Sequence, residues 1–270
     1  MKGICKLGLA FLMVLTATFA FACGDGVKEP EPQATYNDQT TVELYQSALT
    51  AMGDNFTTQG EITMVMKVDE GNGKRPVSYP VVMQMVSKIH GENEYVQLLM
   101  SGVVSGQAEV WYINGWLYDG SSKEKEEMSR EDFEDEYSIG IDAELETAVL
   151  AGLADGYFLV YEDRVTLTCT LSGDAATQAA QAVLEQQLGS GVSATVDEID
   201  CLFTFGKDGQ LKIARYTFTM QAVLQGQSVQ YNYNIKMKYS DVGTTQVSLP
   251  DDADKYVDKD TPVVSNPDIM

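Results

Sequence analysis

Residues 109–119, EVWYINGWLYD, decide the fold of this chain. Asn114-Gly115 at their centre is the strongest hairpin signal in the sequence, because asparagine and glycine accept the positive φ angles of a two-residue turn. Such a turn fixes which residues face one another, so Trp111 is expected opposite Tyr118. The stretch therefore predicts an antiparallel hairpin with a cross-strand aromatic pair.

Two further turns, centred on Gly91-Glu92 and Ser105-Gly106, extend this hairpin toward the N-terminus as a meander. An even number of turn residues again fixes the pairing of the strands. One apolar face is expected to run through all of these strands. Its predicted cross-strand rows are Met83, Met100, Trp111 and Tyr118, and next to it Met85, Leu98, Ile113 and Trp116.

The C-terminal half has the same pattern, with turns centred on Asp208-Gly209 and Gly226-Gln227. The expected rows are Ile199, Phe218 and Ile235, and Cys201, Tyr216 and Met237. Strands of about 216–224 and 229–239 are long, so a wide sheet of them must curve. The predicted fold is mainly β (α+β), a single curved antiparallel sheet or unclosed half-barrel.

Helices are expected to cover the concave face of this sheet. Thr40 with Glu43 forms a capping box for a first helix that Gly53 ends, after which strand-like alternation begins at Phe56. Two more helices are predicted in the middle of the chain, at about 142–156 and 174–188. One or two strands are expected between them, at 157–171.

The N-terminus reads as a lipoprotein signal peptide over residues 1–22. Lys2 and Lys6 precede an apolar run, and small residues end it directly before Cys23. The cysteine is the expected acceptor of a diacylglyceryl group, and two acyl chains, such as palmitate, suffice for stable anchoring. An uncleaved membrane anchor and an ordinary secreted protein are the alternatives.

The rest of the chain divides into three expected parts. Residues 23–39 are polar and contain Pro30 and Pro32, which favours a flexible spacer. Residues 40–253 form the half-barrel domain, and residues 254–270 form a polar acidic tail.

The charge of the chain limits its partners. It has 40 acidic and 18 basic residues, a formal net charge of −22. Nucleic acid is excluded, because binding it requires a basic surface. A lipid tether, rather than a basic patch, is therefore expected to hold the protein at the outer, extracytoplasmic face of the cell membrane.

Catalytic chemistry finds little support in the sequence. His90 is the only histidine and is expected at an exposed turn, which argues against a catalytic triad or a histidine-rich metal site. The carboxylates of residues 123–136 lack the spacing of a calcium loop and are expected in a solvated loop. We expect no enzyme activity, no cofactor and no metal.

Cys169 and Cys201 are the cysteines left after Cys5 departs with the signal and Cys23 is lipidated. An exported protein can bridge such a pair. Both lie among strand-like residues, so two buried thiols are the alternative.

The layout resembles the LolA/LppX/LprG group of bacterial lipoproteins and their Gram-positive relatives. It has a lipobox, a spacer, one helix, a long meander, inserted helices, a second meander and the closing segment Leu249-Pro250-Asp251-Asp252-Ala253. The resemblance covers residues 40–253. It implies a half-barrel with an apolar cavity beneath its helices, which carries lipids or lipidated molecules, although RseB-like relatives use the fold for sensing.

Methionines and aromatic residues are dense on the apolar face, which suits variable apolar ligands because methionine is flexible and polarizable. The alternatives are a lipid or other apolar ligand bound in a sheet-helix cavity, or an ordinary closed core in a non-enzymatic envelope sensor or interaction protein. The candidate ligand-binding residues are Met64, Met66, Met83, Met85, Met100, Trp111, Tyr118, Phe218, Met220, Tyr233, Ile235 and Met237.

The expected lipidation can be tested with Cys23→Ser. The variant should leave the membrane fraction or fail to be processed, because it lacks the thiol that accepts the lipid. Fractionation and the mass of the mature N-terminus measure this. Normal cleavage with unchanged membrane retention would contradict the prediction.

Overall fold

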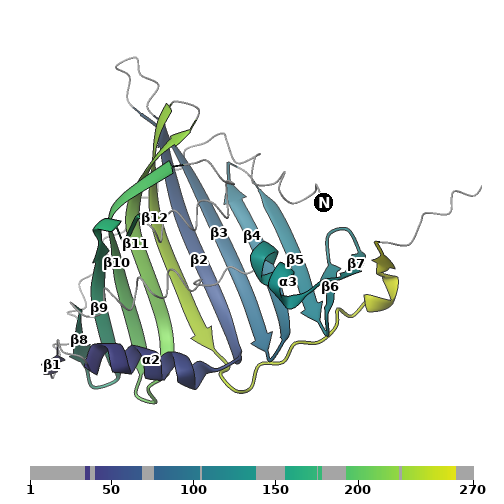
Figure 1. Ribbon diagram of the computed structural model, residues 1–270, viewed down its shortest axis with the longest axis horizontal. Coiled ribbons are helices and arrows are strands. Elements are labelled where there is room, and N and C mark those ends of the chain that lie inside the picture. Colours follow the sequence, from purple (N-terminus) through teal and green to yellow (C-terminus); the bar gives the residue numbers. More distant parts are fainter. Residues whose placement is uncertain are drawn as a thin grey trace, which may run out of the picture.

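Backbone hydrogen bonds join 13 strands into one unclosed sheet in the computed structural model (Figure 1). The structure describes residues 34–36, 40–68, 76–103, 105–137, 156–174, 176–177, 193–224 and 227–259. The strand order is β1-β8-β9-β10-β11-β12-β2-β3-β4-β5-β6-β7-β13. Neighbours are antiparallel except β13, which pairs parallel to β7. The sheet expected to be purely antiparallel is therefore mixed at one edge.

The protein is mainly β, with few helices. The strands are β1 (Ala34–Tyr36), β2 (Asn55–Val68), β3 (Val77–His90), β4 (Asn93–Gly102), β5 (Gly106–Ile113), β6 (Trp116–Asp119), β7 (Glu124–Glu127), β8 (Tyr157–Val160), β9 (Arg164–Ser172), β10 (Ser193–Gly206), β11 (Leu211–Leu224), β12 (Gln227–Ser240) and β13 (Val257–Asp258). The helices that the structure describes over their full length are α2 (Thr40–Met52), α3 (Arg130–Tyr137) and the short 3-10 helix η1 (Ala253–Lys255).

The hairpin at Asn114-Gly115 is confirmed. Asn114 has φ 53° and Gly115 φ 81°, the positive values that the turn requires. Trp111 lies opposite Tyr118, as expected. The turn at Gly91-Glu92 is likewise confirmed by the pairing of Met83 with Met100.

The turn predicted at Ser105-Gly106 is wrong. Met100 lies opposite Gly106 rather than Trp111, so the connection holds an odd number of residues instead of an even number. Since successive side chains point to opposite faces, this change of parity turns all of β5 over. Trp111 lies opposite Tyr95 instead, and it shares with Tyr118 the face opposite to that of Met83 and Met100. Ile113 and Trp116 are likewise on the opposite face from Met85 and Leu98, because Leu98 pairs with Ala108.

The C-terminal meander keeps its predicted faces with a shifted register. Phe218 lies opposite Ile199, as expected, but its partner on β12 is Tyr233 rather than Ile235. Tyr216 likewise faces Ile235 rather than Met237. A slip of two residues leaves every side chain on its face, because the side-chain period is two.

The face that carries Ile62, Met64 and Met66 is called the apolar face here, and the opposite side of the sheet is the outer face. Helix α2 packs on the apolar face through its buried residues Tyr45, Ala48 and Met52. The rings of Tyr45 and Phe203 lie 4.8 Å apart. Gly53, at φ 55°, ends the helix as predicted.

The two helices predicted in the middle of the chain fall mostly outside the described residues. Of the first, only the closing Gly156 is described. Of the second, Asp174 and residues 176–177 are described, and they are helical together with Gly173. The expected strands between the two helices are confirmed as β8 and β9.

The acidic run expected as a solvated loop instead contains β7 and α3. Ser129 caps α3, because its Oγ accepts the backbone N–H of Asp132 at 3.1 Å. Phe133 is fully buried and stacks on Tyr112 with ring centroids 4.8 Å apart. Tyr112 points to the apolar face, so α3 covers the same side as α2 at the other end of the sheet (Figure 1).

Two short strands lie outside the expected bounds of the half-barrel domain. β1 lies within the expected spacer and pairs with β8. β13 lies beyond the expected end at Ala253 and pairs with β7. His90 is not an exposed tip residue: it is half-buried, and its Nδ1 lies 2.8 Å from the carbonyl oxygen of Thr245. The contact of His90 with Thr245 therefore holds the segment between β12 and β13 against the sheet.

Phe133→Ala should lower the free energy of unfolding by about 3–5 kcal/mol, because it empties the centre of the cluster between α3 and the sheet. Urea unfolding followed by circular dichroism measures the change. Leu99→Ala is the control, since Leu99 is 47% exposed, and it should change stability by about 0.5 kcal/mol or less. Equal effects of the two variants would contradict this packing.

Candidate ligand-binding face

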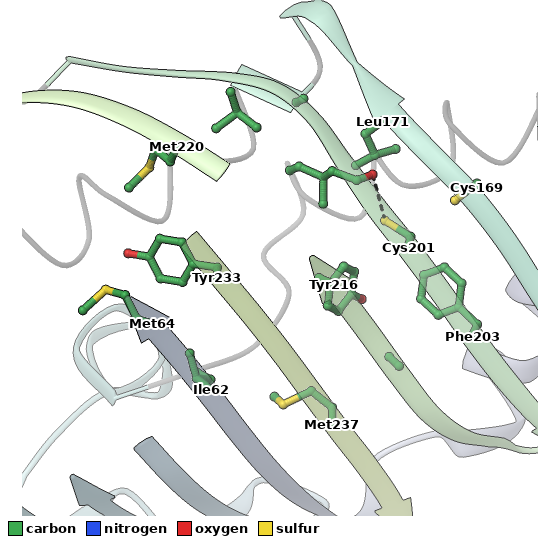
Figure 2. Packing of buried hydrophobic residues seen from close by; sticks show 14 of the residues in the cluster. Ile62, Met64, Cys169, Leu171, Cys201, Phe203, Tyr216, Met220, Tyr233 and Met237 are labelled. Carbon is green, nitrogen blue, oxygen red and sulfur yellow. Dashed lines mark hydrogen bonds between the residues drawn. The ribbon is translucent and has the colours of Figure 1, made fainter. Parts of the chain in front are cut away.

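Ten of the twelve predicted ligand-binding residues share the apolar face, across β2, β3, β4, β11 and β12. They are Met64, Met66, Met83, Met85, Met100, Phe218, Met220, Tyr233, Ile235 and Met237. Figure 2 shows four of them, from β2, β11 and β12, pointing into one cluster. Trp111 and Tyr118 do not belong to it, because they lie on the outer face.

The centre of this face is buried. Met220 is 1% exposed and Tyr233 5%, and the Tyr233 ring stacks on Phe218 with centroids 4.7 Å apart. Gly60 removes one side chain from the face: a Cβ at this position would lie 2.8 Å from Sδ of Met237 and 3.2 Å from Cε of Met85. The two methionines can therefore close over the backbone of β2.

Four tyrosines give this apolar region a polar element, and only Tyr233 was among the predicted ligand-binding residues. They are Tyr216, Tyr231, Tyr233 and Tyr239, and burial is the main cause that raises the pKa of each. The pKa of Tyr239 rises to about 12. These side chains are therefore neutral hydroxyl groups, able to donate a hydrogen bond, at any physiological pH.

Tyr216 is the most distinctive of them. It is 4% exposed, and its Oη has no hydrogen-bond partner among the described residues. The ring packs edge to face on Phe203, with the ring centroids 5.9 Å apart, and it lies beside Cys201 on the neighbouring strand (Figure 2). A buried hydroxyl without a partner costs free energy, so a hydrogen-bond acceptor brought to Oη would be stabilised there. The period-two pattern in β11 put Tyr216 on the apolar face, but only the structure reveals its orphan hydroxyl.

In the described part of the chain, no group of three or more His, Cys, Asp or Glu side chains is placed to hold a metal ion. Within the same residues, no helix is long and apolar enough to cross a bilayer. Cys23 and the signal peptide lie outside the described residues, so the lipid attachment stays a prediction.

Comparison with known proteins gives no family for this chain. No family model matches it, and no curated protein matches it in sequence. Similar solved structures include a DUF1329 family protein from Desulfovibrio piger, with 12% identity over 80% of this chain and 95% of that chain at a TM-score of 0.24. A LolA superfamily protein from Nitrosomonas europaea has 11% identity over 80% and 96% of the two chains at a TM-score of 0.19.

An N-terminal dehydratase from the difficidin assembly line has 12% identity over 74% of this chain and 83% of that chain, at a TM-score of 0.15. Scores this low carry no argument about function. The likeness to the LolA group therefore stays a resemblance of layout.

Cys169 and Cys201 lie directly opposite each other on β9 and β10. Both are buried free thiols, and Cys201 Sγ donates to the carbonyl of Ile199 at 3.7 Å. Directly opposed residues in an antiparallel pair have Cα atoms about 4.5–5.5 Å apart, within the range that a disulfide spans. Contact with Cys169, followed by burial, raises the pKa of the Cys201 thiol, so the folded protein holds little reactive thiolate.

We predict that expression with export to an oxidising compartment lets this pair form a disulfide while the protein folds, before burial protects the thiols. The bridge should stabilise the protein by about 3–4 kcal/mol, because it closes a loop of roughly 30 residues. Alkylation of the denatured, unreduced protein, read by mass spectrometry, should leave both cysteines unmodified. Two alkylated cysteines would instead identify a buried pair of free thiols.

Proposed function

We propose that this chain is a membrane-anchored extracytoplasmic lipoprotein, without enzyme activity, whose apolar face binds a lipid or another apolar molecule. The observation that carries the proposal is the ten-residue methionine and aromatic surface on one side of a single sheet. Unbranched methionine side chains adapt to ligands of different shape. The lipid anchor itself is supported by the residues around Cys23.

The orphan hydroxyl of Tyr216 adds a polar contact to this proposal. An acyl ester or acid has a carbonyl oxygen that could accept its hydrogen bond, while the hydrocarbon chain lies along the methionines. Each buried methylene contributes about 0.8 kcal/mol, and ordering the ligand costs several kcal/mol. A ligand with one acyl chain would therefore bind with low affinity, and a ligand with two chains would bind more tightly.

A sensor or interaction protein with a closed core is the second candidate. The 1% exposure of Met220 favours it, because an apolar face this well covered has the character of an ordinary core. The two candidates differ in one measurable respect, which is whether the face opens for a ligand.

Met220→Trp and Met237→Trp should lower the occupancy of the site, since each places a larger ring in the space meant for the ligand. Native mass spectrometry of protein from its own host and titration with a fluorescent fatty acid measure occupancy. Gln221→Trp is the matched control, because Gln221 is exposed on the other face of the same strand. It should bind like the unaltered protein.

Circular dichroism must show that both variants fold, since overpacking costs about 1–3 kcal/mol. Absence of any co-purifying lipid, together with no probe binding by the unaltered protein, would contradict ligand binding. The closed-core candidate would then stand.

A further inference from the structure

The outer face carries a continuous row of rings that the apolar face does not use. Lys88, Tyr95, Trp111, Tyr118 and Lys125 lie directly opposite one another in turn, on β3, β4, β5, β6 and β7. We call these five residues the aromatic row. Strands lie about 4.8 Å apart, so the backbone positions that carry the three rings follow each other at about that spacing across the sheet.

The row is half-buried: Lys88 Nζ lies 5.5 Å from the ring centroid of Tyr95, and the Tyr256 ring packs edge to face on Tyr118 with centroids 5.5 Å apart. Each of its five residues keeps intermediate exposure, and so does Trp116, the other tryptophan of the chain. Tyr95 and Trp111 have ring centroids 5.3 Å apart, and Tyr95 donates a hydrogen bond to Glu109 at 2.8 Å. The rings are therefore held in place while part of their surface faces solvent.

A hollow of about 250 Å³ lies beside the row on the same face. Val86 connects the two, because it lines the hollow and lies two residues before Lys88 on β3. The lining is mostly amide and charged side chains together with the backbone around Gly60. Its residues are Gln59, Gly60, Glu61, Gln84, Met85, Val86, Lys236 and Lys238.

Further exposed amides continue this polar surface toward the row. Gln97 follows Tyr95 by two residues on β4, and Gln107 precedes Glu109 by two residues on β5. Both are exposed on the outer face. Each amide can donate and accept hydrogen bonds at once.

The charges of this surface indicate what fits it. Lys88, Lys125, Lys236 and Lys238 form no salt bridge with the described residues, and Glu61 and Glu109 lie among them. The two carboxylates offset only part of the charge of the four ammonium groups, and the net charge of −22 of the whole chain repels polyanions. A polar, uncharged ligand therefore suits this surface.

We propose that the aromatic row and the adjoining hollow bind an uncharged glycan chain. A sugar ring presents C–H groups on its face, which pack on aromatic rings, and hydroxyl groups at its edge, which both donate and accept hydrogen bonds. Rings in a line with amides and ammonium groups beside them match both features. This site is independent of the proposed lipid site, since the two lie on opposite sides of the sheet.

The test is calorimetric titration of the purified full chain with hexamers of β-1,4-glucose, β-1,4-N-acetylglucosamine and α-1,4-glucose. Trp111→Ala should weaken the binding of the best hexamer about tenfold or more, as for a central aromatic contact. Gln97→Ala, an exposed substitution that leaves the fold intact, should weaken it by a smaller factor. Tyr157→Ala is the matched control, because Tyr157 is 44% exposed on distant β8, and it should bind normally.

Tryptophan fluorescence supplies a second readout, because both tryptophans of the chain lie on this face. Binding should cause a saturable change in tryptophan emission. In Trp111→Ala, Trp116 should still report binding, but at higher sugar concentrations. Binding of no hexamer would overturn the proposal, as would undiminished binding by folded Trp111→Ala and Gln97→Ala. If the protein binds only an acidic hexamer, of galacturonate, the proposal that the ligand is uncharged is wrong. A dimer in sedimentation that Trp111→Ala abolishes would assign the row to a second copy of this chain.

Discussion

The structure depends on one geometric constraint, the alternation of side chains along strands that are all bonded into a single sheet. Because no strand is free to turn over alone, the number of residues in each connection decides which face the next strand presents. The buried apolar residues of this face extend from Phe158 on β8 to Leu117 on β6, because the connections between the strands keep them on one side of the sheet. The same constraint places the aromatic row on the other side.

The apolar face and the aromatic row therefore lie on opposite sides of one sheet. Beneath α2 the apolar face is closed by aromatic packing, with Phe203 between Tyr45 and Tyr216. At the other end, α3 closes it through Phe133 and through Arg130, which reaches the buried carboxylate of Glu94 at 2.9 Å. The methionines lie between these two anchored ends, where soft side chains leave the sheet most able to adapt.

The sequence allowed prediction of much of this fold, but not of the features that depend on a single turn residue. Asn114-Gly115 has one favourable geometry, so its hairpin could be read directly. Val103 and Ser105 have no such preference, and a connection of odd length there looks the same as an even one. That ambiguity misplaced Trp111 and Tyr118 in the candidate site. Helix α3 was not predicted, because the run of carboxylates favoured a solvated loop and the capping pair of Ser129 and Asp132 was not recognised.

The sheet ends in its two shortest strands, β1 of three residues and β13 of two. An open sheet leaves unpaired backbone groups at each edge, which other chains can extend into fibrils. Here the long strands lie inside the sheet, and each border offers only a few residues for such pairing. On the β13 side the border also includes acidic β7, where like charges oppose the approach of a second copy. The protein can thus keep a wide, unclosed sheet without polymerising along it.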